Sequence, residues 1–486
     1  MIHAFTKSSW KDLLFLTSIV GSYYGLLNLL YFYQHGWLAT HGVDIWFYLV
    51  VARGQQYLTP LDVTRWLVQP VSFLSNENAF LALTLLSVFL HLVSVLLVYH
   101  YLGKYLQPRK SRFLWSLLFA FLPHHLSLTT ASFTHFTVAQ PFLIVAFGRL
   151  IPWCLFQIKR PDIWGLLCLL ESALIGPEGF FMTLLLVCIR LAGSRHKFLV
   201  AIFGIILLLV VAIFFDHLFK VWSVIGVWLR GIDLAWQRRI GCGDLLPLKW
   251  KVLSIFGWFH MVWVALMFYA FFKRQFLIGY LLLFFLVLTF HVVRAFFALE
   301  LVGFISLLVL FSQRNLRWVH PLIIWLILLG IFAHKQVAFP IHLVRMARII
   351  HEHAISNQRI ACSPTYGFFF QAWTNLPTTD DLHHRSESWT HLVSSDPNEA
   401  NQWMLDKKIS FLILTNYDFR FERNGYWSTS GLGETLQKLD DNQFRNTVAV
   451  LLNRNPLLVT PLGILSRQDD TESKQSAFCF IPTHRN

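Results

Sequence analysis

The stretch that decides the fold runs from Phe276 to Phe311 and reads FLIGYLLLFFLVLTFHVVRAFFALELVGFISLLVLF. It consists of two apolar runs, one before and one after Arg294. An α-helix needs roughly 20 predominantly apolar residues to cross a bilayer, and each run comes close to that length. The stretch therefore predicts two membrane spans joined by a turn at Arg294.

The composition of the whole chain agrees with this interpretation. Of its 486 residues, 56% are hydrophobic and only 14% are charged, and the mean hydropathy is +0.53. Soluble domains carry about 25% charged residues. This composition excludes a soluble protein, a disordered chain and a disulfide-rich secreted scaffold. The sequence predicts a polytopic α-helical membrane protein.

Comparable apolar runs recur along the first 335 residues, and we expect about eleven spans in a transmembrane domain of residues 1–335. The candidates cover residues 12–32, 79–102, 113–130, 136–156, 163–175, 178–194, 198–216, 252–272, 276–292, 295–313 and 318–335. The first is too long for a signal peptide and has no small-residue cleavage site, so we expect it to stay in the protein.

The distribution of Lys and Arg predicts the orientation of these spans. Positive charges cluster in the loops on one side of the map, and the short loops on the other side nearly lack them. The clusters are Lys7 and Lys11; Lys104, Arg109, Lys110 and Arg112; Lys159 and Arg160; Arg190, Arg195 and Lys197; Lys273 and Arg274; and Arg314 and Arg317. Cytoplasmic loops carry such an excess, so we expect a cytoplasmic N-terminus. Eleven spans then place residues 336–486 outside the cytoplasm, in the periplasm, a lumen or the extracellular space.

Two large loops are expected on this outward side, residues 33–78 and 217–251. The first contains two amphipathic stretches, 43–53 and 61–74, whose aromatic residues suit a membrane interface. The second is basic and includes Arg238 and Arg239. It is either a solvated amphipathic segment or a cationic surface for a lipid-linked phosphate. The net charge of +14 fits anionic partners, and in a membrane protein it favours lipid phosphates over nucleic acid.

Residues 336–486 have a mixed composition that predicts a small α/β domain. Strands are expected at 359–363, 409–415, 447–452 and 457–466. Asp396 can cap a helix that has Pro397 at its first position and runs to about residue 407. A disulfide between Cys362 and Cys479 is one alternative for a domain outside the cytoplasm.

Three ionisable residues stand out at expected outward turns. Asp44 begins the first amphipathic stretch, Arg294 lies between two spans, and Glu178 follows Gly176-Pro177. Each has a structural alternative: helix capping for the two acids and an interfacial anchor for the arginine. Their functional interpretation is a base or metal ligand at Asp44, a second carboxylate at Glu178 and a phosphate clamp at Arg294. His124 and His135, in the second outward loop, are weaker metal-ligand candidates because no spacing matches a defined zinc motif.

This arrangement resembles the integral-membrane glycosyltransferases of the C-type (GT-C) fold, most nearly the catalytic subunit of oligosaccharyltransferase. Asp44-Ile-Trp-Phe-Tyr48 is similar to the family's Asp-Pro-Trp-Phe-x-Tyr stretch, and Val292-Val-Arg294 is similar to its late-span arginine. Ser363-Pro-Thr-Tyr-Gly367 resembles its Trp-Trp-Asp-Tyr-Gly motif. The order of this motif, the helix from Asp396 and the strand ISFLILT also follows the family.

The resemblance implies transfer of a sugar or glycan from a polyprenyl-phosphate or -pyrophosphate donor to a protein, lipid or glycan acceptor outside the cytoplasm. Asp44 takes the catalytic-Asp position, Arg294 contacts the carrier phosphate, and Ser363, Thr365, Tyr366 and Gly367 lie on the acceptor side. The family also implies a divalent cation, but its second acidic motif has no counterpart, because no Asp or Glu occurs between Glu77 and Asp162.

Other functions fit some of the same features. Within the transferase class, the alternative is a monosaccharide transferase that decorates a lipid or a surface polysaccharide. A transporter or flippase of lipid-linked glycans would use similar basic residues, although such proteins usually show repeated halves and none is evident. A non-catalytic assembly scaffold would leave the basic outward loop unexplained.

Overall fold

The structure is a computed structural model. It describes residues 7–36, 44–56, 58, 62–104, 106, 109–123, 125, 129–154, 160–176, 253–291, 295–311, 319–333, 341–355, 357–362, 364–379, 396–415, 462–470 and 475–482. The chain forms two compact units. The first contains Met1–Ile45, Tyr57–Leu229 and Pro247–Val337, and the second contains Trp46–Gln56, Arg230–Leu246 and Ala338–Asn486.

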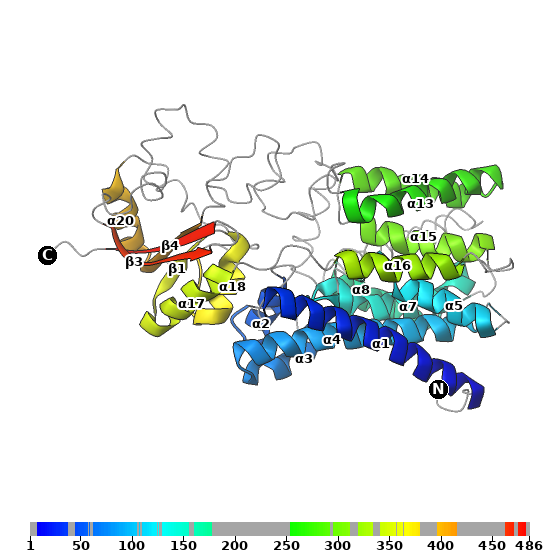
Figure 1. Cartoon of the computed structure of the whole chain (residues 1–486), viewed down its shortest axis with the longest axis horizontal. Helices are drawn as coiled ribbons and strands as arrows, with labels where there is room; N and C mark the ends of the chain where they lie inside the picture. The colour runs from blue at the N-terminus through cyan, green and yellow to red at the C-terminus, as the bar shows by residue number, and fades with distance from the viewer. Residues whose placement is uncertain are drawn as a thin grey trace. The chain divides into compact units, whose positions relative to one another are not determined.

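The described part of the first unit is helical (Figure 1). Its elements are α1 (Lys7–His35), α3 (Val63–Val68), the 3₁₀ helix η2 (Gln69–Phe73), α4 (Asn76–Leu102), α5 (Arg109–Ala120), α7 (His135–Cys154), α8 (Ile163–Ile175), α13 (Leu253–Phe272), α14 (Phe276–His291), α15 (Ala295–Phe311) and α16 (Val319–Ala333). Helix α4 packs on α1, α5 and α7, and α7 packs on α8. A second group is formed by α13, α14 and α15, and α16 packs on α5.

Three helices in the described ranges are long and apolar enough to cross a membrane. They cover Trp10–Gln34, Asn76–Leu102 and His135–Trp153, and they coincide with predicted spans. Five further helices, α8 and α13–α16, also coincide with predicted spans. The spans predicted at 178–194 and 198–216 lie outside the described residues, so the total of about eleven stays a prediction.

The predicted span at 113–130 is not one continuous helix. Helix α5 ends at Ala120, and α7 begins at His135. Between them Pro123, His125 and Thr129 are again helical, whereas Phe121, Leu122, Ala131 and Phe133 are not helical and are almost fully inaccessible to solvent. The run was therefore predicted correctly as buried but wrongly as a single helix.

Large aromatic side chains fill the core of the first unit, and glycines allow helices to approach them. Trp263 of α13 is fully buried. A Cβ atom added at Gly303 of α15 would lie 2.5 Å from the Trp263 ring. Real Cβ atoms essentially never come that close, so glycine at this position is what lets α15 pack directly on the indole.

The second unit is a mixed α/β structure. Its elements are α2 (Asp44–Ala52, of which residues from Trp46 belong to this unit), α17 (Ile341–His353), β1 (Arg359–Ala361), α18 (Pro364–Thr374), α20 (Pro397–Asp406), β2 (Ile409–Thr415), β3 (Leu462–Asp470) and β4 (Gln475–Pro482). The sheet order is β1-β2-β4-β3. The β1–β2 pair is parallel, whereas β4 is antiparallel to both β2 and β3.

Several local predictions in this unit are confirmed. Strand β2 has the predicted bounds, and the Asp396 carboxylate accepts a hydrogen bond of 2.9 Å from the Asn398 N–H at the start of α20. β3 begins later than the strand predicted at 457–466, and β4 was not predicted. The strand predicted at 447–452 lies outside the described residues.

A disulfide between Cys362 and Cys479 does not form. Cys479 pairs with Ile413 of β2, and Cys362 directly follows Ala361, which pairs with Leu412 on the other side of β2. One strand therefore separates the two cysteines. Neighbouring strands are about 4.8 Å apart, so two steps exceed the roughly 7 Å Cα separation that a disulfide tolerates.

Candidate functional site

Asp44, the predicted catalytic aspartate, is the first residue of α2 and is half-buried. It occupies the first turn of the helix and not the cap position that its structural alternative suggested. The exposed N–H groups at a helix N-terminus carry a partial positive charge, which favours an ionised carboxylate. Asp44 therefore lies at the positive end of the α2 dipole, and its catalytic role stays a prediction.

The predicted acceptor-side motif lies at the start of α18. Pro364 opens this helix, a position where its missing N–H costs no hydrogen bond. Tyr366 is half-buried and Gly367 is buried. Thr365 belongs to the same first turn, and Ser363 lies outside the described residues. The motif is thus a helix start that directly follows strand β1.

Helix α2 packs on α18 through aromatic side chains. The ring centroids of Trp46 and Phe369 are 5.1 Å apart in an edge-to-face arrangement, and those of Phe47 and Phe368 are 4.9 Å apart. Trp46, Phe368 and Phe369 are all buried. A segment of the first predicted outward loop is therefore part of the core of the second unit.

Polar contacts continue this interface at the other end of α18. The Arg53 guanidinium donates a hydrogen bond to the Ala372 carbonyl, and Gln55 Nε2 donates one of 3.2 Å to Asn375 Oδ1. Partial burial lowers the pKa of Arg53. These contacts join residues 46–56 and α18 within the second unit.

Most of the other predicted site residues lie outside the described residues. These are Glu178, Arg294, Arg238, Arg239 and His124. Their roles remain predictions based on the sequence.

His135, a weak metal-ligand candidate, lies near a carboxylate that the sequence did not single out. It is the first residue of α7, and it interacts electrostatically with Asp62. Asp62 caps α3 by accepting a 2.8 Å hydrogen bond from the Thr64 N–H, and Glu171 of α8 accepts one of 2.9 Å from the Val63 N–H. Burial raises the pKa of Asp62, although hydrogen bonds from Thr64 and the nearby His135 oppose that shift.

One side chain of α1 holds the segment between α5 and α7. Asn28 Nδ2 donates a hydrogen bond of 2.9 Å to the Thr129 carbonyl, and Asn28 Oδ1 accepts one of 2.7 Å from the Ala131 N–H. Ala131 has a φ of 45°, the left-handed region that a residue with a side chain rarely adopts. Non-helical backbone at membrane depth needs such internal partners because lipid offers none.

A second polar group lies around the end of α5. The Tyr24 hydroxyl donates a 2.6 Å hydrogen bond to the Ala120 carbonyl, and His91 Nε2 lies 3.2 Å from the same oxygen. The His91 and His125 rings also lie close together, with centroids 4.1 Å apart and a tilt of 44° between their planes. All of these side chains are buried, and Tyr24 and His91 supply hydrogen-bond partners to the carbonyl at which α5 ends.

No set of three or more His, Cys, Asp or Glu side chains is arranged to hold a metal ion within the ranges that the structure describes. Asp62 and Glu171 both accept backbone hydrogen bonds from α3, so their described role is to position that helix.

Comparison with solved structures identifies the architecture. The oligosaccharyltransferase of the archaeon Archaeoglobus fulgidus in its apo form aligns with 95% of this chain and 80% of its own, with a TM-score of 0.63 and 10% sequence identity. The chain has an oligosaccharyltransferase-like GT-C fold. The resemblance inferred from degenerate motifs is therefore confirmed at the level of fold.

Further structures of the same archaeal enzyme align comparably. AglB in complex with an inhibitory peptide and a dolichol-phosphate matches with a TM-score of 0.61 at 10% identity, over 96% of this chain and 80% of that one. A form tethered to an acceptor peptide with the NVT sequon has the same TM-score and coverage at 11% identity. Another structure of that enzyme is a complex with zinc and sulfate. No family model and no curated protein matches this sequence.

Proposed function

We propose that the chain is a membrane glycosyltransferase that transfers a sugar or glycan from a polyprenyl-phosphate- or -pyrophosphate-linked donor to an acceptor outside the cytoplasm. The observation that carries this proposal is the oligosaccharyltransferase-like GT-C fold, which extends over 95% of the chain. The archaeal neighbour binds dolichol-phosphate and acceptor peptides, which supports a lipid-linked donor and a protein acceptor.

The proposed reaction joins the acceptor nucleophile to the anomeric carbon of the sugar. The bond between that carbon and the phosphate oxygen breaks, and the phosphate leaves with the electron pair. Asp44 accepts the proton of the nucleophile or orients it. Its position in the first turn of α2 supports this role because the helix N-terminus favours the carboxylate form.

Negative charge develops on the leaving phosphate, and cations stabilise it. Arg294 takes this role, with a planar guanidinium that matches phosphate oxygens, and Arg238 and Arg239 belong to the basic loop that adds positive charge. Glu178 is the proposed second carboxylate. Ser363, Thr365, Tyr366 and Gly367 are proposed to face the acceptor.

The fold family implies a divalent cation, and the zinc complex of the archaeal neighbour is consistent with one. The described carboxylates Asp62 and Glu171 do not fit such a site, because both hold the N-terminus of α3. We derive no step through a metal ion.

The test is transfer by the full-length protein in proteoliposomes supplied with defined lipid-linked donors and with peptide, lipid or glycan acceptors. We expect a glycosylated product and a stoichiometric free lipid phosphate. Arg294→Ala should abolish both, and Arg274→Ala, an exposed arginine at the α13–α14 turn, should leave both unchanged. Translocation of the donor with no new glycosidic bond would instead identify a transporter and overturn the proposal.

A further inference from the structure

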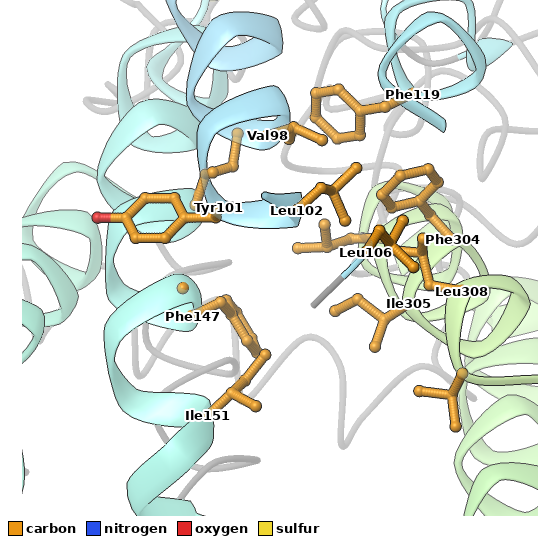
Figure 2. A pocket seen from close by; sticks show the side chains of 14 residues that line it. Val98, Tyr101, Leu102, Leu106, Phe119, Phe147, Ile151, Phe304, Ile305 and Leu308 are labelled. Carbon is orange, nitrogen blue, oxygen red and sulfur yellow. The ribbon is translucent and has the colours of Figure 1, made fainter. Parts of the chain in front are cut away.

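The first unit contains an apolar cavity of about 260 Å³ that the proposed reaction does not use. Helices α4, α7 and α15 form its walls, and Phe119 of α5 and Leu106 complete the lining. Figure 2 shows side chains such as Leu102, Phe147 and Leu308 converging on it. Val309, at the edge of the lining, is 61% exposed, so the cavity opens toward the surroundings of the helices.

The side chains that line the cavity offer almost no hydrogen-bond partners to water. Tyr101 is its one polar side chain, and its hydroxyl points away from the other labelled lining residues (Figure 2). That hydroxyl interacts with Arg149, which also donates hydrogen bonds of 3.1 and 3.0 Å to Asp162. A stable water needs two to four polar partners, so a hydrocarbon chain suits this space better.

The wall between α4 and α7 depends on glycine. A Cβ atom added at Gly148 would lie 2.3 Å from the Tyr101 ring. Any other residue at this position would push the ring away and change the shape of the cavity. Both residues belong to the lining, so the close approach of the two helices is part of how the cavity is built.

Positive charge surrounds the end of α4 beside the cavity. Lys104, between the lining residues Tyr101 and Leu106, has its Nζ 4.9 Å from the centre of the Tyr101 ring. The Arg112 guanidinium lies 5.5 Å from the centre of the Tyr99 ring, two residues before Tyr101 in α4.

The acids at this end are already paired with other residues. Asp12 is bound by Arg109 and Tyr99 and also interacts electrostatically with Arg112, and Asp162 is bound by Arg149. Within the described ranges, neither Lys104 nor Arg112 forms a direct ion pair with a carboxylate. Lys104 and Arg112 thus place positive charge beside an apolar space, a combination that complements a lipid with an anionic head and a hydrocarbon tail.

The position along α4 distinguishes this lipid from the proposed donor. At 1.5 Å per residue, Val98–Leu102 lies about 33–39 Å from Asn76, the start of α4. The hydrocarbon core of a bilayer is about 30 Å thick, so the cavity and the first outward loop belong to opposite leaflets. The donor phosphate is proposed to bind on the side of Asp44, which precedes α4 in that loop.

We propose that this cavity binds one acyl chain of an anionic phospholipid, with the phosphate held by Lys104 and Arg112. The chain fills the space between α4, α7 and α15 and joins helices that come from distant parts of the sequence. A ligand that binds only the folded state stabilises it by mass action, so the lipid is expected to raise the thermal stability of the protein.

The test compares lipid binding by the purified, delipidated full-length protein. Phosphatidylglycerol, phosphatidylcholine and a polyprenyl phosphate are added separately, and bound lipid is counted by native mass spectrometry while unfolding is followed by heating. We expect one tightly retained phosphatidylglycerol, a higher melting temperature with it than with phosphatidylcholine, and weaker effects of the polyprenyl phosphate.

Two pairs of variants separate the tail from the head group. Ile305→Phe fills the cavity and should remove the retained lipid, whereas Ile324→Phe, at an exposed position of α16, should not. Lys104→Gln should weaken the preference for phosphatidylglycerol by about fivefold, the effect of one cation near an anionic lipid. Lys273→Gln is its match, because Lys273 lies 5.8 Å from the Tyr269 ring but away from the cavity.

Several results would overturn the proposal: no retained phospholipid, equal retention by Ile305→Phe, or retention of the polyprenyl phosphate alone. An equal loss of head-group preference in both lysine variants would do the same. If Ile305→Phe does not fold, Val309→Phe fills the exposed edge of the cavity and gives the same comparison. None of these measurements requires glycosyl transfer, so their outcome is independent of the proposed function.

Discussion

Trp46 of α2 and Phe369 of α18 meet edge to face with ring centroids 5.1 Å apart, and both side chains are buried. They join a segment from the first predicted outward loop to a helix that follows the first strand of the sheet. The residue that opens α2 is Asp44, so the helix that carries the proposed base is anchored by an aromatic contact in the second unit.

Trp46→Ala should weaken the packing of α2 on α18. Replacing a fully buried tryptophan with alanine removes its contacts and leaves a cavity, at a cost of about 3–5 kcal/mol. Pulse proteolysis of the full-length protein across a urea series measures this loss. Trp66→Ala is the control: this side chain is 57% exposed, and we expect a change within about 0.5 kcal/mol. Equal effects of the two substitutions would contradict the anchoring role.

Asp44→Asn should lower the rate of transfer by about 10²–10⁴-fold, because the amide cannot accept the proton of the nucleophile. The substitution is nearly isosteric, so expression and thermal stability should change little. Asp396→Asn is a matched control, since Asp396 also lies at a helix start but caps α20 and is exposed. Full transfer by Asp44→Asn in the proteoliposome assay would show that another group accepts the proton.

Asn28→Ala should destabilise the first unit by about 2–4 kcal/mol. It removes the partners of the Thr129 carbonyl and the Ala131 N–H, and a buried polar group left without its partner costs about 1–3 kcal/mol. Thermal unfolding of the variant and the wild type in detergent measures this loss of stability. Ser94→Ala is the control, because the Ser94 hydroxyl bonds only the Leu90 carbonyl within α4, and its loss should cost less than about 1 kcal/mol.

Ionisation of Asp62 should make the folded protein less stable as the pH rises from acidic values. Burial raises the folded pKa of this acid above its ordinary value of 3.8, so the folded state binds the proton more tightly than the unfolded state. The stabilisation from the protonated acid is complete below about pH 3.8 and is lost as the pH rises through the folded pKa.

Asp62→Asn tests this pH dependence, since asparagine keeps the oxygen that caps α3 but cannot ionise. The melting temperature of the variant should therefore fall less than that of the wild type between pH 4 and neutral pH. Parallel curves for the two proteins would show that another group is responsible.

Cys362 and Cys479 should behave as buried thiols. Both side chains are almost fully inaccessible, and burial raises the pKa of Cys479, which disfavours the reactive thiolate. Iodoacetamide should leave both unmodified in the folded protein and modify both after unfolding without a reductant. Peptide mass spectrometry reads out each site, and modification of both only after reduction would contradict the strand order.

Local patterns predicted the elements whose signals are contained in a few neighbouring residues. The helix α20 follows from Asp396, which caps it, and Pro397, which opens it. Strand β2 follows from the apolar run ISFLILT, which becomes a central strand with buried residues. The apolar helices were found for the same reason, because the length of a run is itself the signal for a span.

Features that depend on contacts between residues far apart in the sequence could not be predicted from local patterns. The apolar run after Trp115 continues past position 120, but α5 ends there, and Tyr24, Asn28 and His91 of other helices supply hydrogen-bond partners to the end of α5 and to the segment that follows. Glu171 likewise meets the N-terminus of α3 only in the folded chain, so the sequence singled out Glu178 nearby and passed over it. The interaction of His135 with Asp62 is equally long-range.

The Asn28 contacts also constrain how the protein is made. The ribosome synthesises Asn28 about 100 residues before Thr129 and Ala131, so its amide enters the bilayer long before these partners emerge. Two helices, α4 and α5, are inserted in between. The packing of α1 against α4 and α5 is therefore expected to stay incomplete until residues 129–131 are synthesised. Helices α1, α4, α5 and α7 then form one unit of co-translational assembly.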